Sequence, residues 1–264
     1  MPEVINGDTR LFPIIGDPIK YVKSPERLTA GFAARGHNGV CIPALVAEAA
    51  LADVMRAVSV IQNVDELLIT MPHKFKIAAY CATTSDRTKL LGAVSVMRRN
   101  ADGSWHGDML DGLAFLKAQE NAGAKPAGAR VLMIGAGGAG CAIAVALLEA
   151  GVRELIIHDR DKGRATDLLR VISALGKGRA SLGPPDPTGF DLVCNASSAG
   201  MSADDELPVA AGLLRPTMFV GDVIAGHGTT PFLQAALRAG CKTANGDQMV
   251  DAVQEMMLDF MLRH

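Results

Sequence analysis

The sequence predicts an α/β protein made of two domains, the first of which has a mainly parallel sheet. Three observations favour this fold class. Short apolar segments typical of strands alternate with longer segments typical of helices along most of the 264 residues. Glycine occurs 28 times, which suits tight turns between strands and helices. Hydrophobic residues make up 49% of the chain and aromatic residues only 4%, so we expect a core of mainly aliphatic side chains.

In the first half of the chain, strand and helix signals follow one another in order. Residues 10–18 are typical of a strand that ends in a Gly-Asp-Pro turn. A helix is predicted next, because Ser24 suits an N-cap, Pro25 suits the first turn and Gly36 suits the stop. The same alternation predicts strands over 39–47 and 65–72 and helices over 48–58 and 73–81.

A hairpin interrupts this alternation near residue 100. Residues 94–100 and 104–108 are typical of two antiparallel strands joined by an Ala-Asp-Gly turn. A helix over 110–125 then leads out of the first half. The pattern therefore places a domain boundary at about residue 110.

The composition excludes several classes of protein. A net charge of −2 without long runs of one sign argues against nucleic acid as a partner. No apolar run approaches the roughly 20 residues of a membrane span, and residues 1–16 lack the layout of a signal peptide. The five cysteines are scattered and have no metal-site spacing, which indicates reduced thiols. We expect a cytoplasmic protein without a metal.

The most informative segment is the glycine-rich stretch VLMIGAGGAG, residues 131–140. Gly135, Gly137 and Gly140 fit the G-x-G-x-x-G pattern between an apolar strand and an Ala- and Leu-rich helix. The first glycine allows the tight turn, the second lets backbone amides approach a pyrophosphate, and the third lets helix and strand pack closely. The helix amino terminus adds a favourable partial positive charge.

This loop, which also contains Gly138, predicts a dinucleotide-binding site. Two alternatives stay open: a glycine-rich turn without a ligand, and a site for another nucleotide-like molecule such as S-adenosylmethionine. The next strand ends at Asp159, whose carboxylate would accept hydrogen bonds from a ribose and repel a 2′-phosphate. Arg160 and Arg164 argue for NADP, since guanidinium groups bind phosphate. NAD is slightly favoured over NADP.

The second half continues with further strands and ends in a helix. Strands are predicted within residues 191–201 and 217–226, and the tail over 249–264 is typical of an amphipathic helix. The methionines of this tail are expected to pack in the core.

Several segments together resemble the shikimate/quinate dehydrogenase family over nearly the full length of the chain. They are, in chain order, GDPIKYVKSP, ITMPHK, GAVSV, GDMLDG, IGAGGAG, NASSAGM, TPFL and NGDQM. The resemblance implies a substrate-binding and catalytic domain over 1–110, completed by a helix over 246–264, and a Rossmann NAD(P)-binding domain over 111–245. It implies reversible hydride transfer between NAD or NADP and a secondary alcohol of a cyclic hydroxy acid.

The resemblance also assigns the proton-transfer residues. Lys74 matches the catalytic lysine of the family, and Asp111 matches its aspartate partner. Oxidation of a ring hydroxyl needs a base for the hydroxyl proton, and a lysine in a dry cleft can serve as that base. A solvated lysine at a helix start and an N-capping aspartate are the simpler interpretations of these two residues.

The predicted substrate pocket departs from the family pattern. Ser24, Thr70, Ser95 and Gln254 are expected to hold substrate. Other positions where the family carries polar side chains hold Val22, Leu68, Leu110, Ala225 and Val253. Because unpaired polar groups discriminate strongly against a wrong substrate, these replacements favour a less hydroxylated or bulkier ring acid as the alternative substrate.

The remaining predictions concern the cofactor and the assembly. By resemblance, Asn195, Ser197 and Met201 lie near the nicotinamide, although an ordinary polar turn explains them nearly as well. A small-molecule cyclic hydroxy acid is the expected partner, and the last turn of the C-terminal helix could support a homodimer. A dinucleotide-sensing homologue without turnover is a further alternative, which the retained Lys74 and Asp111 argue against.

Overall fold

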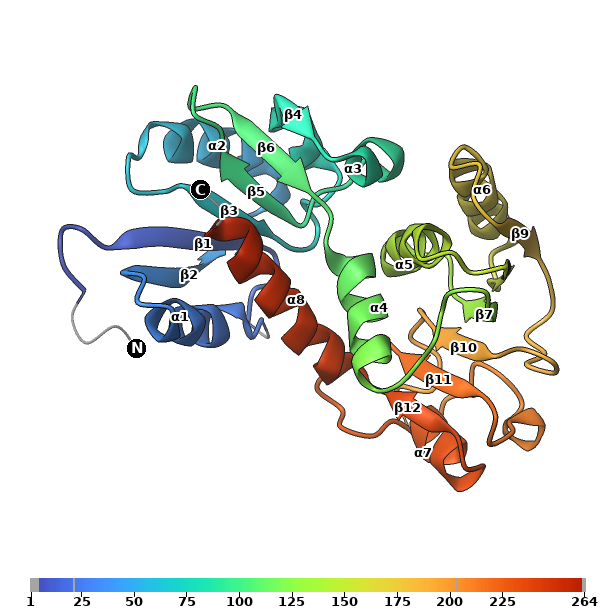
Figure 1. Cartoon of the computed structure of the whole chain (residues 1–264). Helices are drawn as coiled ribbons and strands as arrows, with labels where there is room; N and C mark the ends of the chain where they lie inside the picture. The colour runs from blue at the N-terminus through green and yellow to red at the C-terminus, as the bar shows by residue number, and fades with distance from the viewer. Residues whose placement is uncertain (1–4, 21, 203, 263–264) are drawn as a thin grey trace. The chain divides into compact units, whose positions relative to one another are not determined.

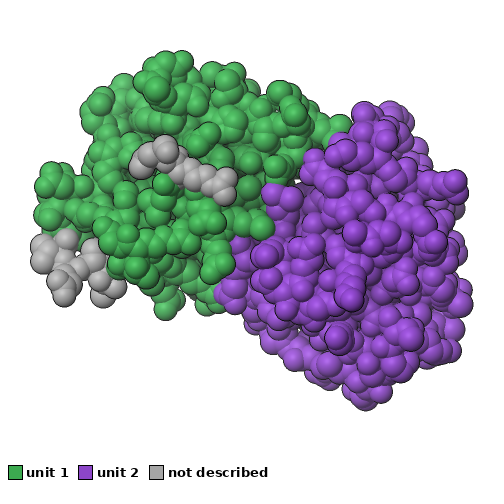
Figure 2. Space-filling model, in the orientation of Figure 1, with its two compact units in different colours: residues 1–110, 254–264 green, residues 111–253 purple. Residues whose placement is uncertain are grey.

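The structure, a computed structural model, describes residues 5–20, 22–202 and 204–262. The chain forms two compact units, coloured separately in Figure 2. The first unit contains residues 1–110 and 254–264, and the second contains residues 111–253. The last helix, α8 (Gly246–Met261), contributes residues to both units.

The first unit contains a mixed, mainly parallel sheet (Figure 1). Its strand order is β2-β1-β3-β5-β6-β4. β1 pairs in parallel with β2 and β3, whereas β5 pairs antiparallel with β3 and β6. The predicted hairpin is therefore confirmed. The strands are β1 (Arg10–Gly16), β2 (Gly39–Leu45), β3 (Glu66–Ile69), β4 (Thr83–Thr84), β5 (Val96–Arg99) and β6 (Trp105–Asp108).

Helices cover both faces of this sheet. α2 (Leu51–Val60) packs Met55 and Val58 on the face that carries Leu67. On the other face, Phe32 of α1 (Ser24–Ala34) stacks on Phe12 with 4.2 Å between ring centroids. The end of α8 packs against α1, since a Cβ on Gly31 would collide with Leu258. The unit also contains η1 (Glu48–Ala50) and α3 (Asp86–Leu91).

Two local predictions in the first unit were wrong. Ser24 is not the N-cap of α1: the cap position is Lys23, and Ser24 is already helical. The predicted helix over 73–81 is only a short 3-10 helix, η2 (Lys76–Tyr80). A segment of five residues is too short for the hydrogen-bond ladder of an α-helix to become stable by itself.

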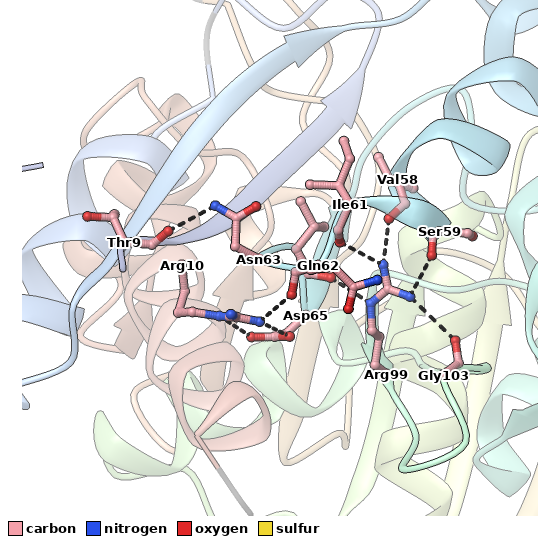
Figure 3. A network of polar contacts seen from close by, with 11 residues as sticks. Thr9, Arg10, Val58, Ser59, Ile61, Gln62, Asn63, Asp65, Arg99 and Gly103 are labelled. Carbon is pink, nitrogen blue, oxygen red and sulfur yellow. Dashed lines mark hydrogen bonds and ion pairs between the residues drawn. The ribbon is translucent and has the colours of Figure 1, made fainter. Parts of the chain in front are cut away.

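Arg99 fixes the carboxyl end of α2 (Figure 3). Its guanidinium donates hydrogen bonds to the carbonyls of Val58 at 2.5 Å, Ile61 at 3.2 Å and Val64 at 2.7 Å. It also lies 4.5 Å from the centroid of the Trp105 ring. Because the last carbonyls of a helix lack partners in the helix, a cation placed there satisfies them and holds the turn into β3.

The second unit is a fully parallel sheet with helices on both faces (Figure 1). Its strand order is β12-β11-β10-β7-β8-β9. The chain proceeds from β7 outwards to β9, returns to β10 on the other side of β7 and then proceeds outwards to β12, so the order of the strands reverses between β7 and β10. Open α/β sheets bind ligands at such a reversal. The strands are β7 (Arg130–Ile134), β8 (Glu154–His158), β9 (Arg179–Leu182), β10 (Leu192–Asn195), β11 (Phe219–Asp222) and β12 (Lys242–Ala244).

The helices of the second unit pack closely on this sheet. α7 buries Phe232 and Leu233 in a cluster with Leu132, Val193 and Val220. On α4, a Cβ at Gly112 would collide with the backbone of Ala142 in α5, so the two helices cross at close range. The helices are α4 (Asp111–Asn121), α5 (Gly138–Glu149), α6 (Lys162–Ser173), α7 (Pro231–Arg238) and the short η3 (Ala211–Leu213). Within the described residues, no helix is both long enough and apolar enough to cross a membrane.

Candidate active site

The glycine loop between β7 and α5 has the geometry of a phosphate cradle. Gly135 has a φ of +107°, and a Cβ there would lie 2.6 Å from the carbonyl oxygen of Ala196. A Cβ on Gly140 would collide with the carbonyl oxygen of Gly135. At Gly137 and Gly138, by contrast, an added Cβ would meet no atom within 4 Å other than those of the adjacent backbone. Gly135 and Gly140 are thus required by the fold, whereas Gly137 and Gly138 face open space.

The start of α5 supplies donors for an anion in this space. Gly137 is the N-cap of α5 and provides no side-chain cap. The first amides of a helix have no partner within the helix, and its amino terminus carries partial positive charge. The loop therefore fits the pyrophosphate of a dinucleotide.

Asp159 braces this loop from the end of β8. Its Oδ2 atom accepts a hydrogen bond from the amide of Ala136 at 2.7 Å, and its Oδ1 atom accepts one from the amide of Asp161 at 2.8 Å. Asp161 in turn caps α6 by accepting from the amides of Gly163 and Arg164. The carboxylate of Asp159 thus holds the loop in shape, and its expected contact with a ribose stays a prediction.

A cavity of about 860 Å³ opens over the loop in the second unit. Among the predicted cofactor residues, its lining includes Gly135, Gly137, Asp159, Arg160, Arg164 and Ser197. Met201 is 37% exposed and is not among the residues that line the cavity.

The rim of this cavity is acidic. Five carboxylates line it, against the guanidinium groups of Arg160 and Arg164. Arg160 pairs with Glu206 at 3.2 Å, and Arg164 pairs with Asp161 at 3.4 Å. The five are Asp159, Asp161, Asp204, Asp205 and Glu206. Asp204, Asp205 and Glu206 were not predicted from the sequence, where the only signal was an acidic run after NASSAGM.

Asn195 shapes the turn beside the glycine loop. It is fully buried at the end of β10, and its amide nitrogen donates to the carbonyl of Ala199 at 3.0 Å and to Asp222 at 3.1 Å. Its Oδ1 atom accepts from the hydroxyl of Ser197 at 2.7 Å. Both polar atoms of Asn195 are thus engaged within the protein, so we infer that it presents Ser197 to the cavity.

Asp222 completes this network at the end of β11. Its Oδ2 atom accepts from the hydroxyl of Thr230, the N-cap of α7, at 2.7 Å. Burial raises the pKa of the Asp222 carboxyl, and hydrogen bonds from Thr230, Ile224 and Asn195 oppose that rise. Sequence reasoning missed Asp222. Its place at the carboxyl end of a strand adjacent to the strand of Asn195 was the available signal.

The first unit carries the residues expected to act on substrate. Thr70 follows β3, its amide donates to the carbonyl of Ile15 at 3.0 Å, and Gly16 leaves the space that its side chain occupies. Lys74 comes four positions later, and its carbonyl accepts from the amide of Val94 at 2.8 Å. The amide of His73 donates to the carbonyl of Thr70 at 3.1 Å, so Thr70 and Lys74 lie on one turn at the carboxyl end of β3.

Ser24 and Gln254 meet in the first unit. The Nε2 atom of Gln254 donates to Ser24 Oγ at 3.0 Å, and both residues are buried. Ser95 lies elsewhere: it is fully buried, and its hydroxyl accepts from the amide of Leu110 at 2.8 Å. Asp111, which begins α4, belongs to the second unit. A direct or water-mediated contact of Ser95 with substrate stays a prediction.

The positions that depart from the family pattern differ in exposure. Leu68 and Leu110 are buried, Val22 is half-buried and Ala225 is exposed. The two buried leucines supply apolar side chains where the family carries polar ones.

The parallel sheet, the glycine loop and the acid after β8 define a dinucleotide-binding α/β protein. A model of the shikimate dehydrogenase substrate binding domain matches residues 14–97, and a model of the ThiF family matches residues 113–175. A shikimate dehydrogenase (NADP(+)) of Rubrobacter xylanophilus is 37% identical over 252 residues, which cover 93% of this chain and 88% of the relative.

Two solved structures are similar over nearly the whole chain. One is a shikimate 5-dehydrogenase from Listeria monocytogenes in complex with shikimate and NAD, at a TM-score of 0.91 and 28% identity. The similarity covers 98% of this chain and 93% of the dehydrogenase chain. The other is a 5-ketofructose reductase of Gluconobacter sp. strain CHM43, at a TM-score of 0.89 and 27% identity. The similarity covers 96% of this chain and 93% of the reductase chain.

The chain belongs to the shikimate/quinate dehydrogenase family. It is an NAD(P)-dependent dehydrogenase that acts on a CH–OH group.

Proposed function

We propose that the protein interconverts a secondary alcohol and a ketone on a shikimate- or quinate-like ring acid. The observation that carries this proposal is the ITMPHK segment, which holds Thr70 and Lys74 on one hydrogen-bonded turn at the end of β3. Under this proposal the first unit binds substrate and the second binds the dinucleotide.

Lys74 is the general acid/base in this proposal. In the direction of oxidation, its neutral amine takes the proton of the ring hydroxyl at Nζ, and in reduction it returns that proton to the carbonyl oxygen. Asp111, which matches the aspartate of the family, is the proposed partner that orients the amine. NAD or NADP would supply the hydride chemistry when bound, and the glycine loop, Arg160, Arg164 and Ser197 would hold it.

The substrate is held by a small set of polar groups. The hydroxyls of Ser24 and Thr70 and the amide of Gln254 are the proposed contacts. The Oε1 atom of Gln254 is buried without a partner among the described residues, which supports its use by a ligand. Ser95 acts indirectly in this proposal, since its bond to the amide of Leu110 fixes the residue before Asp111.

A ring acid with fewer hydroxyls is the second candidate substrate. The burial of Leu68 and Leu110 favours it, because apolar side chains at these positions offer no hydrogen bond to a hydroxyl. The structural likeness to a reductase that acts on 5-ketofructose also supports testing substrates beyond shikimate.

NAD is the proposed cofactor in preference to NADP. The five carboxylates at the rim of the cavity repel the added negative charge of a 2′-phosphate, and each nearby arginine is already paired with one of them. Several curated relatives are named as NADP(+) enzymes, so this preference separates the chain from them.

We also propose a cytoplasmic location, and a homodimer stays a prediction. All five cysteines are free, which supports a reducing compartment. Burial raises the pKa of Cys41 and of Cys194 to about 12, so these thiols are unreactive.

The test of the function is a comparison of Lys74→Ala with the wild type. We expect turnover of a ring hydroxy acid to fall by about 10²–10⁴-fold, the usual contribution of a general acid/base. The Kd of the dinucleotide, measured by titration, should stay unchanged because Lys74 lies outside the second unit. Equal turnover in Lys74→Ala would overturn the assignment.

A further inference from the structure

His73, the residue before Lys74, has an unusual environment for an imidazole. Its exposed fraction is 0%, and its Nε2 atom lies 2.8 Å from the carbonyl oxygen of Val46. Since a carbonyl only accepts, we assign the ring proton to Nε2. The imidazole therefore joins the turn that carries Lys74 to the segment that follows β2.

The backbone around His73 is tied down at both ends. The amide of His73 donates to the carbonyl of Thr70 at 3.1 Å, and the amide of Ile77 donates to the carbonyl of His73 at 3.0 Å. The amide of Val46 donates to the carbonyl of Gly16 at 3.1 Å, so the acceptor of the imidazole is itself anchored to the end of β1. The bond from the imidazole to the Val46 carbonyl therefore links the backbone that carries Lys74 to the end of β1.

The environment of the other ring nitrogen, Nδ1, indicates that His73 does more than fill space in the core. Nδ1 is buried, and no described residue offers it a hydrogen bond. A buried polar atom without a partner destabilises the folded state, whereas an apolar side chain of similar size would fill the space without that cost. The stabilising contact of the ring is the one from Nε2 to Val46.

We propose that His73 is a positioning residue for Lys74. The bond from Nε2 to the Val46 carbonyl sets the direction in which the Lys74 side chain leaves its turn. This inference rests on the proposed function, because the amine that it positions is the proposed acid/base. Displacement of a catalytic group by about 1 Å can cost on the order of 10²-fold in rate.

The first test compares three variants of the protein. His73→Leu has a similar side-chain volume but lacks the hydrogen-bond donor. His73→Gln keeps a donor, because the amide nitrogen of glutamine is separated from Cβ by the same number of bonds as the Nε2 atom of histidine. The matched control is Lys76→Gln, which removes an exposed ion pair with Glu48, at 2.7 Å, between the same two segments. Initial rates with a ring hydroxy acid, dinucleotide binding and thermal unfolding are measured for each.

We expect His73→Leu to lower kcat by about 10–100-fold, with the KM for the ring acid and the Kd for the dinucleotide nearly unchanged. His73→Gln should recover most of the rate, and Lys76→Gln should match the wild type. In the Lys74→Ala background, His73→Leu should cause no further loss of rate, since residues that act as one unit are not additive. The inference is overturned if His73→Leu keeps the wild-type kcat, or if it lowers the rate equally in both backgrounds.

A second readout needs no turnover. The methylated amine of Lys74 gives an NMR signal, which is assigned by its loss in Lys74→Ala. We expect this signal to shift in His73→Leu and to return in His73→Gln, and an unchanged signal in His73→Leu contradicts the inference. A wild-type protein that turns over no ring acid overturns the proposed function, and the amine signal then still decides the inference about His73.

Discussion

Gln254 donates a hydrogen bond from Nε2 to the hydroxyl oxygen of Ser24 at 3.0 Å, although 230 positions separate the two residues. The contact ties the end of the chain to α1 within the first unit. Both side chains are buried, so the bond is shielded from water. The pair therefore combines a structural role with the proposed role in holding substrate.

We predict that Gln254→Leu weakens substrate binding more than it weakens the fold. Loss of one neutral hydrogen bond costs about 0.5–1.5 kcal/mol of stability, while an unpaired hydroxyl at Ser24 and a lost amide should raise the KM of the ring acid by about 10-fold. Steady-state kinetics and denaturant unfolding measure the two effects. Glu255→Ala, at an exposed position of the same helix, is the control. An unchanged KM would remove Gln254 from the substrate site.

Asp159→Ala should weaken the binding of NAD and NADP together. The carboxylate holds the amides of Ala136 and Asp161, so its loss loosens the glycine loop for either dinucleotide. A hydrogen bond to a charged group contributes about 1.5–3 kcal/mol, which corresponds to a Kd at least about 10-fold higher. Calorimetric titration checks this, with Asp167→Ala on the exposed face of α6 as the control. A loss confined to NAD would instead indicate that Asp159 acts through the ribose.

Glu206→Gln should shift the cofactor preference towards NADP. The substitution frees Arg160 from its exposed ion pair and removes one negative charge from the rim of the cavity. We expect the KM of NADP to fall by about 3–10-fold at low salt and less at high salt, because exposed charges are screened. The KM of NAD should change little. A ratio of the two constants equal to that of the wild type would contradict the role given to the acidic rim.

The burial of Glu66 leads us to predict that the stability of the protein depends on pH. It is 4% exposed on β3, opposite Arg98 of β5. Burial, with a smaller effect from Asp65, raises its pKa from 4.5 to about 9, and Arg98 opposes the rise. The folded state therefore binds more protons than the unfolded state between these two values, so stability falls as the pH rises through this window.

Glu66→Gln removes this dependence. We expect the variant to gain stability over the wild type from pH 5 towards pH 9, by at most about 1.4 kcal/mol for each pH unit. Urea unfolding at several pH values measures the gap, and Glu26→Gln on the exposed side of α1 is the control. A constant gap across this range would mean that Glu66 is ionised in the folded protein.

The alternation of strands and helices could be predicted from sequence because it depends on local patterns. The glycine loop is the clearest case: the close contact at Gly140 is with Gly135 of the same short motif, although the contact at Gly135 is with Ala196 of a distant segment. Ser24 shows the limit of local reasoning. Its hydroxyl is not used at the helix start, and a side chain 230 positions away donates to it instead.

The same limit applies to the candidate site. The contact of Asp159 with a ribose stays a prediction, and its hydrogen bonds from the amides of Ala136 and Asp161 were not predicted from the sequence. The acidic rim was missed because Asp204, Asp205 and Glu206 come from a loop far along the chain. His73 is adjacent to Lys74 in sequence, but its burial and its bond to Val46 depend on the packing of β2 against β1.

The most direct measurement is the appearance of the reduced-nicotinamide absorbance band when the purified protein is mixed with shikimate, quinate or a less hydroxylated ring acid, each with NAD and with NADP. We predict turnover of at least one ring acid, faster with NAD than with NADP and nearly lost in Lys74→Ala. Absence of reduction in every mixture, although the dinucleotide binds, would contradict the proposal that this chain oxidises a ring hydroxy acid.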